Sequence, residues 1–102
     1  MYVIKEQDAA LLLEFRERER KDFSLELRRL LNRLRLVPLA GREVAVTVES
    51  GAKWRLAKLG PHRGDPLAFI DDRIFTSVKE AEFQVLKMRW RRLTPFPLNL
   101  AE

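Results

Sequence analysis

The spacing of apolar residues changes twice along this chain, and this limits the folds that the chain can adopt. Up to residue 35 apolar residues recur at helical spacing, within 43–59 they alternate as in a β-strand, and within 78–93 the helical spacing returns. The sequence therefore predicts an α+β fold in the order α-α-β-β-β-α, with an antiparallel three-stranded sheet and the C-terminal helix packed on it.

Two helices are predicted before the sheet. The first covers Asp8 to about Arg18. The second covers Phe23 to about Arg35, and its apolar arc consists of Phe23, Leu27, Leu30, Leu31 and Leu34. No Gly or Pro separates the helices, but one unbroken helix would span about 40 Å, more than a domain of this size is wide. We therefore expect a break near residues 19–22, with a continuous helix as the alternative.

The alternating valines that follow predict a β-hairpin. A two-residue turn would place Trp54 and Leu56 on the face opposite the valines. A three-residue loop, Glu49 to Gly51, would give the glycine the positive φ that a bulged loop needs. It would also pair Val46 with Trp54 on one face. The same register pairs Val44 with Leu56, and we predict this three-residue loop.

The rest of the chain predicts a loop at 60–66, a third strand at 67–70, and a short extended segment at 73–75 after a turn. Ser77–Glu80 has the pattern of a capping box, which opens a last helix that runs to about Leu93. We expect a single domain made of a helical part, a sheet-plus-helix part and an extended tail, at 1–40, 41–93 and 94–102.

The last helix is apolar on two sides. One side carries Phe83, Leu86, Trp90 and Leu93. The other carries Val78, Ala81, Val85 and Met88. A helix of this kind is usually covered on both sides, so Trp90 is expected in the core and not stacked on a base. The cations of this helix lie between the apolar sides and are expected to be structural: Lys87, Arg89, Arg91 and Arg92.

These apolar sides, the leucines of the first helix and the tail residues Phe96, Leu98 and Leu100 exceed what one small core covers. The sequence therefore predicts a homodimer. The alternative is a first helix that folds back over the last one.

The chain carries 20 Lys and Arg against 15 Asp and Glu, a net charge of +5. This excess favours polyanionic partners. The second helix has an arc of one charge sign behind its leucines, and two further cations are expected to point away from the valine face of the hairpin. The six predicted binding residues are Arg28, Arg29, Arg33, Arg35, Lys53 and Arg55.

The leading prediction is that these cations bind nucleic acid without catalysis. The alternative is a protein-interaction role, in which the chain is an accessory subunit of a larger complex and its arginines meet an acidic partner. Both follow from the same charges, and salt-sensitive binding of nucleic acid would separate them.

The strand residues Lys53-Trp54-Arg55, followed by Phe75-Thr76 and by Glu80-Ala81 at a helix start, form a pattern. This segment resembles plant AP2 domains and the arm-binding domains of phage-type integrases, and the resemblance implies DNA binding through a sheet face. It differs at 67–70, which is apolar where a reading face is polar. From residue 23 the order of elements is also similar to double-stranded-RNA-binding domains, without the lysine-rich start of their last helix. We predict membership of neither family.

The sequence offers little for catalysis. It has no cysteine, which excludes disulfides and thiolate ligands, and its one histidine, His62, lies in a loop. Asp65, Asp71 and Asp72 could surround a hard cation, but aspartates in turns usually serve turn chemistry. We therefore predict no enzyme, no metal and no cofactor. The N-terminus lacks the pattern of a signal peptide and no segment is long enough to span a membrane, so we predict a cytoplasmic protein.

Overall fold

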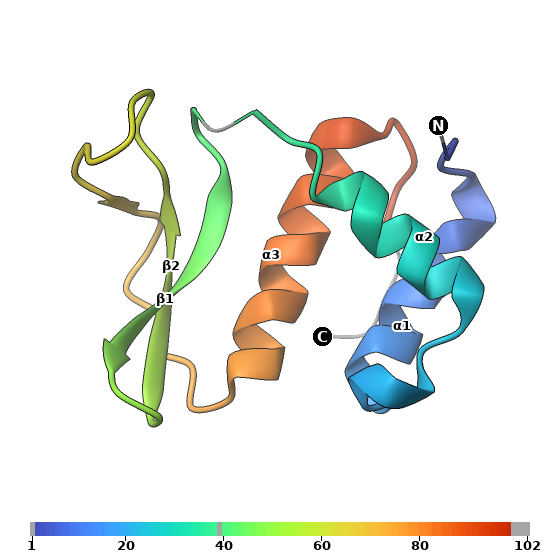
Figure 1. Ribbon diagram of the computed structural model, residues 1–102, viewed down its shortest axis with the longest axis horizontal. Coiled ribbons are helices and arrows are strands. Elements are labelled where there is room, and N and C mark those ends of the chain that lie inside the picture. The colour runs from blue at the N-terminus through green and yellow to red at the C-terminus, as the bar shows by residue number, and fades with distance from the viewer. Residues whose placement is uncertain (1, 39, 99–102) are drawn as a thin grey trace. The chain divides into compact units, whose positions relative to one another are not determined.

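The computed structural model describes residues 2–38 and 40–98 (Figure 1). The predicted dimer contact Leu100 lies outside the described residues. The order of elements confirms the predicted α+β fold, with a short 3₁₀ turn before each of the first two helices. In chain order the elements are η1 Glu6–Asp8, α1 Ala9–Glu17, η2 Arg20–Asp22, α2 Leu25–Leu34, β1 Glu43–Glu49, β2 Lys53–Lys58, β3 Ala68–Phe69 and α3 Val78–Leu93. The sheet is antiparallel, in the order β1-β2-β3.

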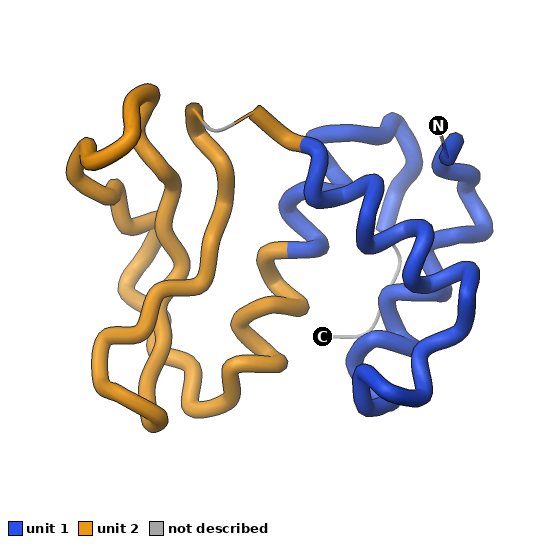
Figure 2. Tube along the Cα trace, viewed as in Figure 1, with its two compact units in different colours: residues 1–36, 86–102 blue, residues 37–85 orange. Residues whose placement is uncertain are grey.

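The chain divides into two compact units (Figure 2). Unit 1 consists of residues 1–36 and 86–102 and holds α1, α2 and the second half of α3. Unit 2 is the continuous segment 37–85 and holds the sheet, on which the first half of α3 packs. One helix thus contributes to both units. That the whole chain behaves as a single domain stays a prediction.

The predicted break between the first two helices is confirmed. α1 ends at Glu17, and the chain passes through the extended residue Glu19 and then η2 before α2 begins. Ser24 caps α2, because its Oγ accepts a hydrogen bond from the backbone N–H of Leu27 at 3.1 Å. All residues of the predicted apolar arc are buried: Phe23, Leu27, Leu30, Leu31 and Leu34.

The hairpin forms, but its predicted register is wrong. Trp54 pairs with Thr47 and not with Val46. Leu56 pairs with Ala45, one residue away from its predicted partner. The cause is a β-bulge near the end of β1, which takes up one residue that the sequence pattern assigns to the ladder.

β2 is the central strand, and it is buried on both faces at Leu56 and Ala57. Leu56 and Ala57 point to opposite faces because they are adjacent in a strand, yet both are fully buried. The alternation of residues along β2 therefore does not identify a single buried face. For this reason, pairing the valines of β1 with the apolar residues of β2 gives the wrong partners. A further correction follows from the observed register. Arg55 pairs with Val46, so Lys53 and Arg55 share the face of the valines, where the sequence analysis expected the opposite face.

Replacing Gly51 with alanine is expected to lower the free energy of unfolding by about 1 kcal/mol. Gly51 has the predicted positive φ, 70°, and a Cβ built on it meets no atom within 4 Å, so the cost comes from backbone conformation and not from a clash. Urea unfolding measures the effect. Gly51→Asn is the control, because asparagine tolerates this conformation better than alanine. A neutral or stabilising Gly51→Ala would contradict this account of the turn.

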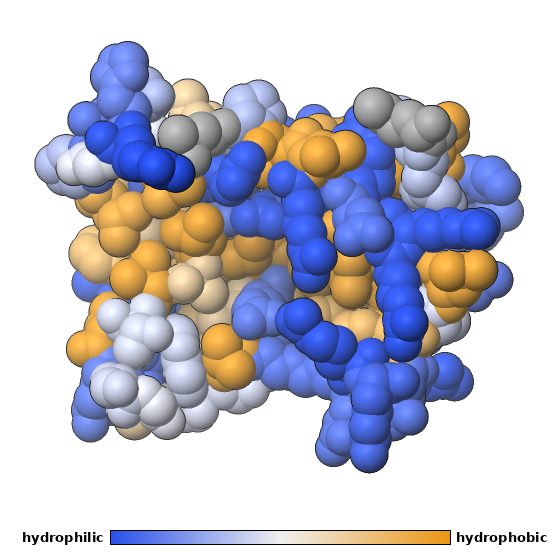
Figure 3. Space-filling view, viewed as in Figure 1, coloured by the Kyte–Doolittle hydropathy of each residue, from blue (hydrophilic) through white to orange (hydrophobic). Residues whose placement is uncertain are grey.

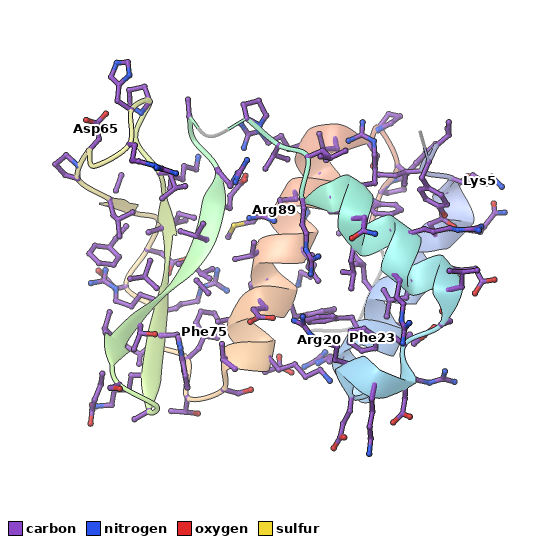
Figure 4. The ribbon with its side chains drawn as sticks, viewed as in Figure 1. Lys5, Arg20, Phe23, Asp65, Phe75 and Arg89 are labelled. Carbon is purple, nitrogen blue, oxygen red and sulfur yellow. The ribbon has the colours of Figure 1, made fainter. Side chains whose placement is uncertain are left out.

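The third strand is confirmed but short. β3 covers only Ala68–Phe69, which pairs with the end of β2. Farther along, Phe75 (labelled in Figure 4) exchanges two backbone hydrogen bonds with Trp54, at 2.9 and 2.8 Å. The predicted turn lies between these pairings, where Asp71 Oδ1 accepts a hydrogen bond from the backbone N–H of Arg73 at 2.9 Å.

α3 begins and ends where the sequence predicts. At its start, Ser77 Oγ accepts a hydrogen bond from the backbone N–H of Glu80 at 3.3 Å. Both predicted apolar sides contain buried residues, which are Phe83, Leu86 and Trp90 on one side and Ala81 and Val85 on the other. Met88 and Leu93 are half-buried, and Val78 is 42% exposed.

Trp90 is confirmed as a core residue. Its side chain is fully buried, and its Nε1–H donates a hydrogen bond to the carbonyl oxygen of Phe96 at 2.9 Å. The ring is therefore not available for stacking on a base. Lys87, expected between the two apolar sides, is itself buried. Of the basic stretch at the end of α3, Lys87 is thus part of the packing and Arg89 is half-buried, whereas Arg91 and Arg92 are exposed.

Candidate functional site

The six predicted binding residues fall into two groups that differ in their partners. On β2 the cations have partners within the fold. Lys53 Nζ lies 3.4 Å from Glu49 Oε2. Arg55 donates a hydrogen bond to the carbonyl oxygen of Asp71 at 2.9 Å, and its guanidinium lies 3.9 Å from the ring centre of Phe69. Both cations are therefore engaged in contacts within unit 2.

The other four arginines lie on α2 or at its C-cap, and they have no ionic partner among the described residues. Arg28, Arg29 and Arg35 are exposed, and Arg33 is half-buried. Among the described residues, no carboxylate oxygen lies within 4.0 Å of these four guanidinium groups. Arg35 makes only an exposed 3.4 Å contact with Asn32 Oδ1. The predicted arc of one charge sign is therefore present on α2, and its charge is not compensated.

The outer side of α2 and the two residues after it form two ridges at i, i+4, i+7 spacing. One ridge consists of Arg28, Asn32 and Arg35. The other consists of Arg29, Arg33 and Leu36. Each ridge borders a groove, and Figure 3 shows hydrophilic side chains over this part of the molecule with hydrophobic atoms visible between them. The first groove has a volume of about 610 Å³ and is lined by Arg20, Lys21, Phe23, Arg28, Leu31, Asn32 and Arg35. The second, of about 350 Å³, is lined by Tyr2, Arg29, Asn32, Arg33 and Leu36.

The first groove combines an apolar floor with cationic walls. Phe23 and Leu31 lie at the bottom, and each is only 8% exposed. The ring of Phe23 packs against that of Phe15, with 5.6 Å between ring centres, which fixes its position. Arg20, labelled beside Phe23 in Figure 4, comes from η2, and Arg28 comes from α2. The groove therefore suits a ligand that carries both apolar and negatively charged groups.

The sequence analysis assigns no binding role to five polar or exposed residues that line these grooves, which are Tyr2, Arg20, Lys21, Asn32 and Leu36. In the alternating charges of residues 16–21, Lys21 Nζ lies 3.8 Å from Glu19 Oε2. In contrast, no carboxylate of the described residues lies within 4.0 Å of Arg20. No local sequence signal singles out Arg20, because only the packing of η2 beside α2 brings it to the groove.

Tyr2 closes the second groove as a neutral hydrogen-bonding group. Its hydroxyl donates to Asp8 Oδ2 at 2.6 Å, and the backbone N–H of Lys5 donates to the same oxygen at 2.9 Å. Burial, together with the hydrogen bond and charge of Asp8, raises the pKa of Tyr2 to about 12. The phenol therefore stays protonated near neutral pH and has a structural role at the N-terminus.

Glu14 ties α1 to the start of α2. Its Oε2 accepts a hydrogen bond from the backbone N–H of Ser24 at 2.6 Å, and its Oε1 accepts one from the Ser24 hydroxyl at 2.8 Å. Burial acts to raise the pKa of Glu14, but the hydrogen bonds from Ser24 and the charge of Arg18 outweigh it, and the net pKa is lowered. This link holds the ends of the segment that carries Arg20 and Lys21.

This link is expected to stabilise the protein only while Glu14 is ionised. Because folding lowers the pKa of Glu14, the contribution is complete above its usual value of 4.5 and is lost as the pH falls through the lower folded-state value. We expect Glu14→Gln to cost about 1 kcal/mol at neutral pH and progressively less under acidic conditions. Urea unfolding across the acidic range measures this, with Glu17→Gln on the exposed side of α1 as the control. A cost of Glu14→Gln that is independent of pH would contradict the assignment.

The grooves on α2 offer binding groups and no acid–base pair. Guanidinium groups stay protonated in proteins, and the amide of Asn32 does not titrate. The one histidine, His62, is an exposed residue of unit 2, where its backbone N–H donates to Asp65 Oδ2 at 3.0 Å in a loop. Within residues 2–38 and 40–98, no group of three His, Cys, Asp or Glu side chains could hold a metal ion. The site is therefore suited to binding a negatively charged partner.

Comparison with known proteins changes the functional interpretation. In the described part of the chain, no helix is long and apolar enough to cross a membrane. No curated protein matches the chain. The family model of the N,N-dimethylformamidase alpha subunit matches residues 2–98. The predicted nucleic-acid-binding function is therefore wrong, as is the DNA binding implied by the AP2 resemblance, and the accessory-subunit alternative agrees better with this match. Because the match covers nearly the whole chain, the protein belongs to the N,N-dimethylformamidase alpha subunit family.

Proposed function

We propose that this chain is a non-catalytic subunit of an amide-hydrolysing enzyme and acts by binding a separate catalytic subunit. The observation that carries the proposal is the match of residues 2–98 to a family of alpha subunits, since an alpha subunit is a component of a larger enzyme. The uncompensated arginines of α2 support it, because exposed charge of one sign favours association with a partner of opposite charge.

The reaction implied by the family name is hydrolysis of a small neutral amide. Water adds to the formyl carbon of N,N-dimethylformamide, the C–N bond breaks, and formate and dimethylamine are released. This chemistry needs a group that activates water and a group that protonates the leaving amine. The α2 grooves present guanidinium, ammonium and amide groups and the protonated phenol of Tyr2, and none of these is a suitable base near neutral pH. We therefore assign the chemistry to the partner subunit.

The test is to purify the complex through an affinity tag on this chain and to measure formate release from N,N-dimethylformamide. The complex is expected to hydrolyse the amide, and the isolated chain is expected to be inactive. Full activity of the isolated chain would show that it is itself the enzyme. Failure to recover a second subunit under low-salt conditions would contradict an accessory role.

Self-association stays a prediction within this proposal. Unit 1 exposes large apolar side chains, with Leu25 57%, Leu36 61% and Val3 73% exposed. Such residues are often covered in an assembly. Light scattering of the isolated chain at micromolar concentration is expected to give the mass of a dimer. The mass of a monomer would contradict the predicted homodimer. The exposed apolar residues would then be expected to contact the catalytic subunit.

A further inference from the structure

We propose that the first groove on α2 is the docking site for an acidic segment of the catalytic subunit. Carboxylates of that segment would meet Arg28 and Arg35, and an apolar side chain would cover Phe23 and Leu31. The inference rests on the proposed function, since it names the surface through which the subunit would attach to its partner.

The charge of the groove argues for an acidic occupant. Arg20, Arg28 and Arg35 line it, and among the described residues none of the three has a carboxylate within 4.0 Å. Like charges close together on one surface repel each other, and a negatively charged partner removes that repulsion. In contrast, Lys53 and Arg55 on β2 already have partners within the fold. They are therefore less available for contacts with a second protein.

The spacing of the arginines argues for a segment of polypeptide and not for a small anion. Arg28 lies on α2, and Arg35 is the C-cap of this helix seven residues farther along, which corresponds to about 10 Å along the helix axis. A single small anion could bridge them only if both side chains bent toward it, whereas two carboxylates can each form a bidentate pair with one guanidinium group. Two carboxylates that are two turns apart on a partner helix have the same separation and match both arginines.

The floor of the groove indicates that the partner segment also carries an apolar side chain. Phe23 and Leu31 are apolar and nearly buried, and the groove of about 610 Å³ is large enough for bulky side chains. N,N-dimethylformamide has only a few heavy atoms and no charge, so the groove is a poor match for this substrate. Apolar anchors surrounded by charged groups are the usual arrangement of a protein interface.

The groove is also built on fixed elements. Ser24 caps α2 and is held by two hydrogen bonds from its own groups to Glu14 of α1. Phe23 packs on Phe15, as described above. A surface that is ordered before association loses less entropy when it binds, which favours affinity.

The test uses charge reversal with a matched control. The catalytic subunit is obtained by dissociating the purified complex, and its affinity for labelled variants of this chain is measured at low salt. Arg28→Glu with Arg35→Glu is expected to raise the Kd about 100-fold, because two attractive contacts become repulsive. The control, Lys58→Glu with Arg63→Glu, makes the same change in net charge at exposed positions of unit 2 and is expected to change the Kd less than threefold.

The outcomes separate this inference from the proposed function. If the wild type binds the catalytic subunit and the α2 variant binds equally well, the docking site is wrong while the subunit role stands. If both double variants lose affinity equally, general positive charge and not the groove explains binding. If the wild type does not bind the catalytic subunit at all, the proposed function itself fails.

A photo-crosslinking residue at position 32 gives a second measurement that does not depend on charge. Asn32 is exposed and borders both grooves, so a crosslinker there is expected to attach to an acidic segment of the catalytic subunit. The same photo-crosslinking residue in place of Lys58 is expected to give no crosslinked product with the catalytic subunit. Crosslinking from position 58 and not from 32 would overturn the assignment of the docking site.

Discussion

Replacing Trp90 with alanine is expected to lower the free energy of unfolding by about 3–5 kcal/mol. The Trp90 side chain is fully buried, and the change would remove its packing together with the hydrogen bond from Nε1–H to the carbonyl oxygen of Phe96. A loss of this size is a large part of the about 5–15 kcal/mol that stabilises a typical domain. Urea unfolding followed by circular dichroism measures it.

Trp90→Phe is the matched control, since it keeps an aromatic ring in the core and removes the hydrogen-bond donor. We expect this variant to lose distinctly less stability than the alanine variant, because the ring still fills most of the volume. If both substitutions cost less than about 1 kcal/mol, the ring is not packed as the structure describes it.

Replacing Leu30 with alanine is expected to cost about 2–5 kcal/mol, whereas Arg28→Ala on the same helix should change stability by no more than about 0.5 kcal/mol. The two side chains lie on opposite sides of α2. Leu30 is fully buried, and Arg28 is exposed without an ionic partner in the described residues. Denaturant unfolding of the two variants under identical conditions compares them directly.

This comparison also supports the docking experiment. A nearly neutral Arg28→Ala would show that the outer side of α2 can be changed without loss of the fold. Lost affinity in the charge-reversal variant could then be assigned to the surface. A destabilisation by Arg28→Ala comparable to that by Leu30→Ala would mean that the arginine supports the fold, and it would remove the basis for a free docking face.

The helical parts of the fold could be predicted because their signals are local. The apolar arc of α2 and the capping contact of Ser77 depend on residues within a few positions of one another. The hairpin register could not be predicted, because it depends on a bulge in β1 and on a part of β2 that is covered on both faces. Adjacent buried residues such as Leu56 and Ala57 carry no alternation from which a face could be inferred.

The candidate site could be predicted in part for a similar reason. The arginines of α2 share one helix arc and are visible in the sequence, whereas Arg20 joins them only through the packing of η2 beside α2. Arg55 has the same charge as the α2 arginines, but it contacts Asp71 and Phe69 within the fold. These two residues are distant from Arg55 in the sequence, so the sequence does not reveal the contacts. The kind of partner could not be predicted, because Coulomb attraction is the same toward a phosphate as toward a carboxylate.

The division of the chain into units has a consequence for biosynthesis. Unit 2 is an uninterrupted insert at 37–85 within unit 1, so α1 and α2 are made first, and the second half of α3, which belongs to the same unit, is made only after unit 2. Domains generally fold as units during synthesis from the N-terminus. We therefore expect ribosome-bound chains that are stalled before residue 86 to be cleaved readily by protease within α1 and α2, and released chains to resist. Pairing with a second polypeptide through α2 would then follow the synthesis of α3.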